Sequence, residues 1–385
     1  MQRPGKVLIV DDEKSNRQIL EAYLLSEGYL TFQASGGQEA MQLTKEISPD
    51  MILLDVMMPE LDGFAVCHLL KNDPTTKIIP VIIITALDDR ETKIRGLEAG
   101  ADDFLTKPVN PLELKARVRS LIRVKRYYEQ IEDMNQKLMA NMAKAQKIQR
   151  ALMPKEFPQT KEFHFQAFYQ AAEMVGGDYY NVFSVDEENI CLYVADVTGH
   201  GLDAAMLTIF IKETINGYIR QTFTKGQIFS PRLCLVELDE KFKAEDFPED
   251  IFITIFLGFI NLKNRTFTYS SAGFVEFPYV FGPRGVWQLH CPGSLIISYG
   301  SLGEYEEKTL ALHPGDRILF YTDGLVEQRT TSGEIYGPER LKRLLENYQS
   351  IGKENLLSEI ISSVQSFAGG STFQDDIVLL QLVVD

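Results

Sequence analysis

The sequence has few cysteines, and their spacing does not fit a metal site. Its four cysteines (Cys67, Cys191, Cys234 and Cys291) are scattered along 385 residues without a CxxC pair. A disulfide framework and a zinc site are therefore disfavoured. We expect four reduced, mostly buried thiols, as in a cytoplasmic protein.

Long apolar runs and an excess of positive charge are also missing. No run approaches the roughly 18 residues that span a membrane, and the best one, 251–260, fits a buried strand. The N-terminal residues do not have the shape of a signal peptide, because their short apolar stretch ends in acids. Lys and Arg number 39 against 54 Asp and Glu, a net charge of −15. We expect a cytoplasmic localisation, no membrane insertion and no nucleic-acid partner, because binding phosphates needs a positive face.

Short apolar runs alternate with amphipathic stretches in the first part of the chain. The runs are 6–10, 51–55, 79–85 and, more weakly, 101–106; helical patterns such as 15–26 and 63–72 lie between them. This order predicts an α/β doubly wound domain with a parallel sheet. Because the carboxyl ends of parallel strands meet at one edge, we expect five polar residues to converge there: Asp11, Asp12, Asp55, Thr85 and Lys107.

These five residues have the chemistry of a phosphoryl-acceptor site. Three carboxylates would repel one another unless a divalent cation lay between them, and oxygen-only ligands favour magnesium. Asp55 is then the candidate acceptor, Lys107 would pair with the phosphate and Thr85 would hydrogen-bond it. The alternative is an acidic surface cluster beside an unrelated lysine, which the ordered placement of all five at strand ends disfavours.

A segment without glycine follows, from 112 to 152, and it predicts one long helix. If Leu121 is placed at position a of a heptad repeat, alternating steps of three and four residues give a mostly apolar seam. Asn135 and Gln149 then also occupy a positions. The seam is Leu121, Val124, Tyr128, Ile131, Asn135, Leu138, Met142, Ala145, Gln149 and Leu152. This repeat predicts a parallel dimeric coiled coil, and hence a homodimer. A single amphipathic helix docked on its own following domain is the alternative.

After Pro158 the pattern predicts an α+β domain with antiparallel strands. Strand-like runs lie at 189–195, 251–261, 266–271, 317–321 and 377–384, and helical patterns at 202–222, 337–348 and 353–367. The residues 261–265 read as a hairpin turn. Four separated acidic motifs occupy this region: 175–180, 195–201, 321–327 and 374–378.

Each motif places an aspartate beside a glycine or at a strand end, where the backbone can approach a ligand. Carboxylates without a cysteine or multiple-histidine cluster favour magnesium or manganese. Two such ions can activate water and hold a phosphoryl group. One Asp-Gly pair alone would be an ordinary turn, but four in order favour a metal site.

The motifs of the first part resemble those of response-regulator receiver domains. They are Val10-Asp-Asp-Glu13, Leu54-Asp-Val-Met-Met-Pro59 with Asp62-Gly63, Thr85-Ala86, and Gly100 to Pro108 with the sequence GADDFLTKP. The resemblance implies phosphorylation of Asp55 by a histidine kinase. It also implies magnesium on Asp12, Asp55 and the Met57 carbonyl, with Asp11 in the outer coordination sphere. Thr85 and Phe104 would form the switch pair.

The four acidic motifs, together with 146–154, resemble the metal-dependent (PPM, type 2C-like) serine/threonine phosphatases, and among them the RsbU-like enzymes that control sigma-factor regulators. The resemblance implies two packed antiparallel sheets flanked by helices, and two magnesium or manganese ions. Asp196 would bridge the ions, with the Val197 carbonyl, Asp323 and Asp375 as further ligands and Asp178 bound directly or through water. His200 is a candidate leaving-group acid, and a structural histidine is the alternative. The implied substrate is a phosphoserine or phosphothreonine protein, namely an anti-sigma-factor antagonist.

The chain departs from this pattern at three positions. Ser271 and Phe274 stand where the family often has Asn and His, and Asn181 where it often has Asp. Whether Asp375 or Asp376 is the ligand stays open, as does whether phosphorylation activates or inhibits.

We predict a receiver domain over 1–122, a helical coiled-coil linker over 123–153 and a phosphatase domain over 154–385. The alternative function is an adaptor that binds a partner without catalysis. Intact metal carboxylates argue against it, and the change at Phe274 argues for it.

Overall fold

The computed structural model describes residues 4–86, 90–199, 201–245, 247–291, 296–301, 303–351, 355–370 and 372–385. The chain divides into two compact units, Met1–Leu138 and Met139–Asp385. Helix α5 (Pro111–Leu152) is continuous across this division. Within the ranges just given, no helix is both long and apolar enough to span a bilayer.

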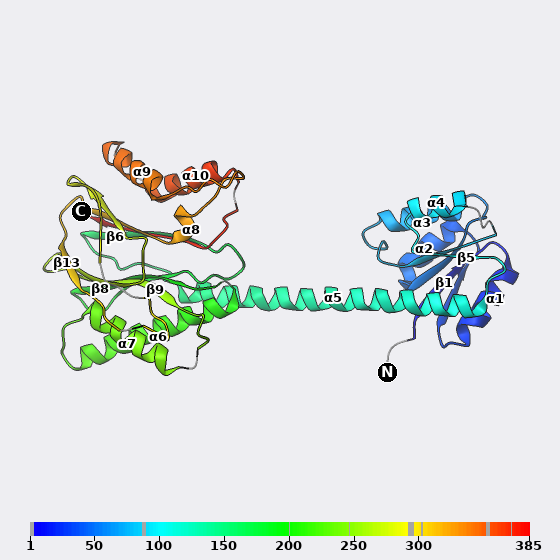
Figure 1. Cartoon of the computed structure of the whole chain (residues 1–385), viewed down its shortest axis with the longest axis horizontal. Coiled ribbons are helices and arrows are strands. Elements are labelled where there is room, and N and C mark those ends of the chain that lie inside the picture. Colours follow the sequence, from blue (N-terminus) through cyan, green and yellow to red (C-terminus); the bar gives the residue numbers. More distant parts are fainter. Residues whose placement is uncertain are drawn as a thin grey trace. The chain divides into compact units, whose positions relative to one another are not determined.

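The first unit contains a five-stranded sheet in the order β2-β1-β3-β4-β5 (Figure 1). All of its strand pairs are parallel, which confirms the α/β doubly wound prediction. The strands are β1 (Lys6–Val10), β2 (Leu30–Ala34), β3 (Met51–Asp55), β4 (Val81–Thr85) and β5 (Asp103–Thr106). The helices are α1 (Lys14–Leu25), α2 (Gly37–Ile47), α3 (Gly63–Asn72), α4 (Arg90–Glu98) and the first turns of α5.

Helices cover both faces of this sheet and produce two apolar cores. On one face, Leu20 of α1 and Leu114 and Val118 of α5 pack against β1, β3 and β4. On the other face, α2 and α3 supply Ala40 and Val66. Because both faces are buried, β3 and β4 are apolar at nearly every position rather than alternating.

The second unit contains two antiparallel five-stranded sheets, in the orders β13-β10-β9-β8-β7 and β12-β11-β14-β15-β6. The strands of the first sheet are β7 (Tyr179–Ser184), β8 (Asn189–Val197), β9 (Ile253–Asn261), β10 (Thr266–Ala272) and β13 (Lys308–Ala311). Those of the second are β6 (Phe163–Gln170), β11 (Tyr279–Gly282), β12 (Gly285–Gln288), β14 (Arg317–Tyr321) and β15 (Ile377–Val384). The predicted hairpin is confirmed, because β9 and β10 pair from Asn261↔Thr266 onward.

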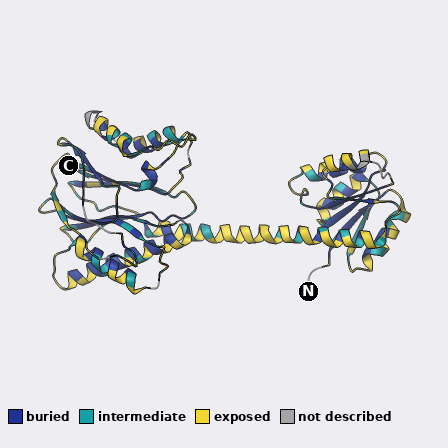
Figure 2. Cartoon of the chain, viewed as in Figure 1, coloured by how far each residue is buried: buried dark blue, intermediate teal, exposed yellow. Residues whose placement is uncertain are grey.

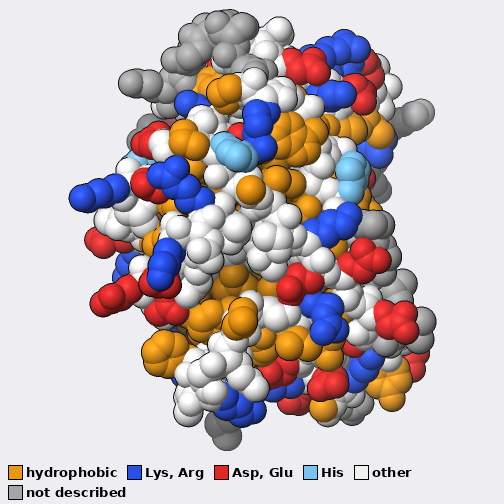
Figure 3. Space-filling model, turned by 90° about the vertical axis from the view of Figure 1, so that its left-hand side faces the viewer, with side chains coloured by type: hydrophobic (Ala, Val, Ile, Leu, Met, Phe, Trp, Pro, Cys, Tyr) orange, Lys and Arg blue, Asp and Glu red, His pale blue; other side chains and the backbone are white. Residues whose placement is uncertain are grey.

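The two sheets pack face to face, and each outer face carries helices (Figure 1). Helices α6 (Leu202–Thr224) and α7 (Pro231–Ala244) cover the sheet that contains β8 and β9, while α9 (Pro338–Ile351) and α10 (Leu356–Ala368) cover the other. The short α8 (Asp323–Val326) follows β14 directly. On the face of this unit shown in Figure 3, acidic and basic side chains are interspersed rather than separated by sign.

The single long helix predicted over 112–152 is confirmed by α5. Its middle is exposed (Figure 2), including the seam residues Val124, Ile131 and Leu138. The seam is different near the C-terminal end of the helix, where Gln149 is only 4% exposed and packs on its own unit. At that position the side chain contacts its own unit, as the docked-helix alternative expects, and the coiled coil stays a prediction for the exposed part of the helix.

Candidate active sites

The carboxyl edge of the parallel sheet brings the first group of predicted residues together. Asp11 follows β1, Asp55 ends β3, Thr85 ends β4 and Lys107 follows β5. The Lys107 Nζ lies 3.0 Å from Asp11 Oδ2 and 3.0 Å from Asp55 Oδ1. Carboxylate oxygens of Asp11, Asp12 and Asp55 all lie within 4.8 Å of one another. Asp11, Asp12, Asp55 and Lys107 therefore lie together, as the strand-end argument predicted, and the Thr85 carbonyl accepts a hydrogen bond from the Lys107 N–H at 2.8 Å.

Charges in this site are only partly balanced. Burial raises the pKa of Asp55, although the Lys107 ammonium opposes the shift. Burial lowers the pKa of Lys107, but its contacts with Asp11 and Asp55 outweigh this effect and the pKa is raised. Lys107 pairs with Asp11 and Asp55, and Arg17 donates to the backbone carbonyls of Asp11 and Asp12. The three carboxylates form an oxygen-only donor set that fits a divalent cation. Asn16 was missed by the sequence analysis; its Nδ2 lies 3.1 Å from both Asp11 oxygens.

Of the two predicted switch residues, Thr85 is the last residue of β4 and Phe104 lies within β5. Thr85 is buried and Phe104 is half-buried. A Cβ atom at Gly96 of α4 would come within 2.4 Å of Phe104 Cε1, so the glycine makes room for the ring. Met57 lies in the loop after β3 with its side chain 66% exposed.

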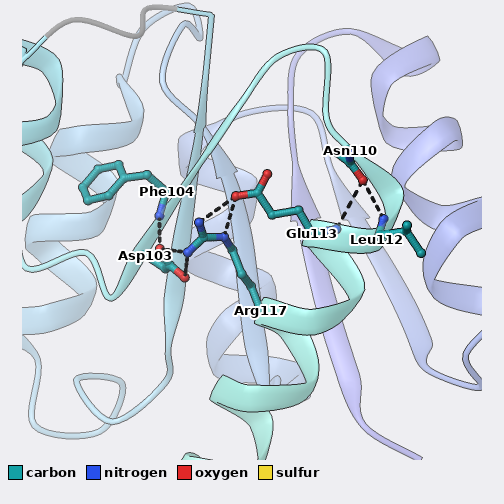
Figure 4. Close-up of polar contacts among 6 residues, drawn as sticks. All are labelled: Asp103, Phe104, Asn110, Leu112, Glu113 and Arg117. Carbon is teal, nitrogen blue, oxygen red and sulfur yellow. Dashed lines mark hydrogen bonds and ion pairs between the residues drawn. The ribbon is translucent and has the colours of Figure 1, made fainter.

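Polar contacts join Phe104's strand to the start of α5 (Figure 4). The Asp103 carboxylate accepts a hydrogen bond from the Phe104 N–H and forms an ion pair with Arg117. Arg117 also pairs with Glu113 one turn earlier. Asn110 Oδ1 accepts from two backbone N–H groups of the first turn and so caps the helix. The residue before Phe104 is thus connected directly to α5.

The four aspartates of the second unit come from four separate segments. Asp178 precedes β7, Asp196 lies in β8, Asp323 begins α8 and Asp375 lies just before β15. Asp178 is 2% exposed, and burial together with the charge of Asp196 raises its pKa well above the ordinary range. Burial, followed by the charges of Asp323 and Asp375, raises the pKa of Asp196 to about 7. The four carboxylates therefore interact electrostatically, and the charges of the neighbouring aspartates favour the protonated forms of Asp178 and Asp196.

A threonine that the sequence analysis missed fixes the Asp178 side chain. Thr322 Oγ1 donates to Asp178 Oδ2 at 2.6 Å and accepts from the Val378 N–H at 2.9 Å. Its hydroxyl therefore joins the ends of β14 and β15 to the segment before β7. Thr322 belongs to the third acidic motif, so its position next to Asp323 could have identified it as a site residue from the sequence.

Glycines in the motifs allow the four segments to approach one another. A Cβ atom at Gly177 would lie 2.5 Å from the Val197 carbonyl oxygen. A Cβ atom at Gly324 would lie 1.9 Å from the Asp376 carbonyl oxygen and 3.2 Å from Asp375 Cβ. The sequence analysis expected the backbone beside these glycines to be able to approach a ligand, and that stays a prediction. The structure shows the glycines in close contact with neighbouring backbone, which lets the segments that carry the aspartates approach one another.

The two adjacent aspartates 375 and 376 have different surroundings. The buried Asp376 carboxylate accepts from the N–H groups of Ala172 at 2.8 Å, Gly177 at 2.7 Å and, weakly, Asp178 at 3.5 Å. Its hydrogen bonds hold the segment before β7 in place. Asp375 is exposed, and its charge contributes to the raised pKa of Asp323. This arrangement favours Asp375 as the residue that faces a cation.

Of the three departures from the expected pattern, Phe274 has a packing role in the structure. The Phe274 ring is buried and packs edge-to-face on Phe256, with centroids 6.2 Å apart. Ser271 and Asn181 are buried as well. Glu276, two residues after Phe274, is an acid that the sequence analysis missed. Burial and the charge of Asp323 raise its pKa to about 7.

His200, the predicted leaving-group acid, lies outside the described residues. The remaining predicted ligands fit hard divalent cations, because carboxylates that raise one another's pKa provide concentrated negative charge for a cation to balance. The Val197 carbonyl lies against Gly177, next to Asp178 in the chain.

Both units are similar to known protein domains. Residues 7–119 match the response regulator receiver domain family. Over 121 residues, 31% of this chain, the sequence is 54% identical to response regulator PleD of Caulobacter vibrioides. Over 118 residues it is 49% identical to the probable transcriptional regulator ycf27 of Guillardia theta. The matches cover 27% and 45% of those relatives, so the chain spans less than half of either.

The second unit has the fold of a PP2C domain. The SiaA-PP2C domain of Pseudomonas aeruginosa superimposes with a TM-score of 0.56 at 20% identity, covering 66% of this chain and 99% of that domain. Residues 186–385, more than half of the chain, match the family described as Stage II sporulation protein E (SpoIIE). The chain therefore belongs to the SpoIIE family and carries a response-regulator receiver domain before its PP2C-like domain.

Proposed function

We propose that this chain is a two-component response regulator in which phosphorylation of Asp55 controls a metal-dependent protein serine/threonine phosphatase. One observation carries the proposal: four aspartates from four distant segments lie close enough to interact electrostatically, and burial and the charges of neighbouring carboxylates raise the pKa of Asp178, Asp196 and Asp323. Such clusters are costly in a fold unless cations compensate them, and they concentrate at functional sites.

In the receiver, the phosphodonor is a histidine kinase and Asp55 is the acceptor. Magnesium would be held by Asp12, Asp55 and the Met57 carbonyl, with Asp11 in the outer coordination sphere. The Lys107 ammonium, 3.0 Å from Asp55, is placed to pair with the added phosphate. Thr85 and Phe104 would then rearrange as the switch pair.

In the phosphatase domain, two magnesium or manganese ions would be held by Asp178, Asp196, the Val197 carbonyl, Asp323 and Asp375. When bound, such ions lower the pKa of water and offset charge on a phosphoryl group. Asp196, which interacts electrostatically with Asp178, Asp323 and Asp375, would be the ligand shared by the two ions. The Thr322 hydroxyl holds the Asp178 carboxylate in one orientation.

The substrate is a phosphoserine or phosphothreonine protein, which we propose to be an anti-sigma-factor antagonist. The reaction would take place in the cytoplasm. The net charge of −15, and the interspersed charges in Figure 3, do not favour a nucleic-acid partner.

The active form is a homodimer joined by a parallel coiled coil along the exposed part of α5. Val124, Ile131 and Leu138 are each more than half exposed in one chain, and a second α5 would cover them. Asn135 would hydrogen-bond its twin and fix the register. Phosphorylation would shift or rotate the paired helices.

Phosphatase assays separate this proposal from the adaptor alternative. The wild-type chain should hydrolyse p-nitrophenyl phosphate in the presence of manganese, and its rate on a phosphorylated anti-sigma-factor antagonist should change when acetyl phosphate is added. Asp196→Asn and Asp323→Asn should abolish both reactions, because each removes an anionic ligand. Near wild-type turnover of Asp196→Asn at saturating manganese would contradict the two-metal mechanism, and inactivity of the folded wild-type chain would favour the adaptor.

Sedimentation of the full chain tests the dimer. We expect a dimer at tens of micromolar in the wild type and a change of oligomeric state in Asn135→Ile, because an apolar pair at this position no longer selects two strands. A strict monomer in both would exclude the coiled coil.

A further inference from the structure

The last turn of α5 contacts the peptide that precedes the Asp178 segment. Gln149 Nε2 donates to the Gly176 carbonyl at 2.7 Å, and the Gly176 N–H and the Tyr169 hydroxyl approach Gln149 Oε1 at 3.4 Å each. One side-chain amide thus contacts both polar groups of Gly176. Because Gln149 is 4% exposed, loss of these contacts would leave the peptide groups without solvent as a substitute.

Gly176 lies against the carboxylate that fixes the same segment. A Cβ atom at Gly176 would lie 2.1 Å from Asp376 Oδ2, the oxygen that accepts from the Gly177 N–H. The peptide is therefore held between the Gln149 amide and the Asp376 carboxylate, two residues before Asp178. A shift of Gly176 would move the backbone of Asp178 away from Thr322.

The same helix end also contacts the residue after Asp178. The Leu152 carbonyl accepts from the Tyr179 hydroxyl at 2.8 Å and from Lys212 Nζ at 2.6 Å. Since Tyr179 is fully buried, its ring gives the helix end a fixed position relative to β7. Helix α5 therefore contacts the chain on both sides of Asp178, through Gln149 before it and Leu152 after it.

We propose that Gln149 is a positioning residue for the metal site: by hydrogen-bonding Gly176 it sets the position of Asp178, so that the end of α5 determines how tightly the site binds a divalent cation. This inference rests on the proposed function for its metal ligands and adds the residue through which the linker acts. It also explains why Gln149, an a position of the heptad pattern, is turned toward its own unit. A merely structural role would alter stability without altering cation binding.

The test compares the full-length wild type with Gln149→Met and a matched control. Methionine keeps the length and helix propensity of glutamine but cannot make these hydrogen bonds. Gln136→Ala is the control, because Gln136 is an exposed residue of the same helix at a b position. Two quantities are measured: the manganese concentration that gives half-maximal phosphatase activity, and the shift of thermal unfolding that manganese produces. Unfolding is followed by fluorescence of the single tryptophan, Trp287 in β12.

We expect Gln149→Met to raise the half-maximal manganese concentration by roughly three- to tenfold, the equivalent of one neutral hydrogen bond. The manganese-induced shift should shrink in parallel, while kcat at saturating manganese should recover and Gln136→Ala should match the wild type. Unchanged manganese dependence in a folded Gln149→Met variant would overturn the inference. So would an equal loss of activity at all manganese concentrations. If the wild type is inactive, the unfolding shift still tests Gln149, so failure of the proposed function is distinguished from failure of this inference.

Discussion

Replacing Asp196 by Asn should stabilise the metal-free phosphatase unit while removing its response to metal. The pKa of Asp196 is raised to about 7, first by burial and then by Asp323 and Asp375. The folded state therefore binds a proton more tightly than the unfolded chain, whose aspartates titrate near 3.9. Stability contributed by this group is present below the unfolded pKa and is lost as the pH rises toward 7.

The size of the stability change follows from the difference between the pKa of Asp196 in the folded state and its pKa in the unfolded chain. Each pH unit is worth about 1.4 kcal/mol, so ionised Asp196 destabilises the metal-free fold by at most about 4 kcal/mol at pH 8. Solvent screening reduces this figure, and we expect about 2 kcal/mol for Asp196→Asn. In a unit of this size, 1 kcal/mol corresponds to roughly 2–4 °C in Tm.

Thermal unfolding with chelator, followed by Trp287 fluorescence, measures this difference because the chain's single tryptophan reports only on the second unit. The stability of the wild type should fall between about pH 4 and 7, and that of Asp196→Asn should fall less. Manganese should stabilise the wild type by about 2.7 kcal/mol at a hundredfold excess over its Kd, and the variant much less. Asp250→Asn, at an exposed aspartate of the same unit, is the control.

The reasoning would be refuted by a metal-free Asp196→Asn variant that is no more stable than the wild type at pH 8. It would also be refuted if manganese stabilised the variant and the wild type equally.

Three further substitutions test local features of the two sites. Gly177→Ala should lower phosphatase activity by about a hundredfold or more, because its methyl group would lie 2.5 Å from the Val197 carbonyl and displace the segment; a steady-state assay that finds normal kcat would contradict this. Gly96→Ala should expel the Phe104 ring and destabilise the receiver by about 1–3 kcal/mol, and its phosphatase output without phosphodonor should differ from that of the wild type. Met57→Asn should shorten the lifetime of the receiver phosphate, since an amide can orient water where the exposed thioether cannot; an unchanged decay rate of radiolabelled phosphate would rule this out.

The elements found from the sequence are those with a strong local pattern. The buried strands β1, β3 and β4 form continuous apolar runs, and α5 extends over 42 residues without glycine. The strands β6 and β7 were missed. Apolar and polar residues alternate only over the first five residues of β6, and β7 has neither strict alternation nor an apolar run. The short β11, β12 and β13, of four residues each, depend on their neighbours for pairing and carry little local signal.

The sequence by itself determined the division into a parallel α/β part, a long helix and an antiparallel part, and it predicted which aspartates belong to the two candidate sites. These features could be predicted because chain order, residue type and periodicity are local properties of the sequence and do not depend on tertiary contacts. Only the tertiary structure decided which of two adjacent aspartates is held by backbone N–H groups, since Asp376 contacts Ala172 and Gly177 some two hundred residues earlier. The structure likewise decided that Gln149 contacts Gly176. Helical periodicity defines a face of a helix, but what covers that face depends on packing between segments distant in the chain.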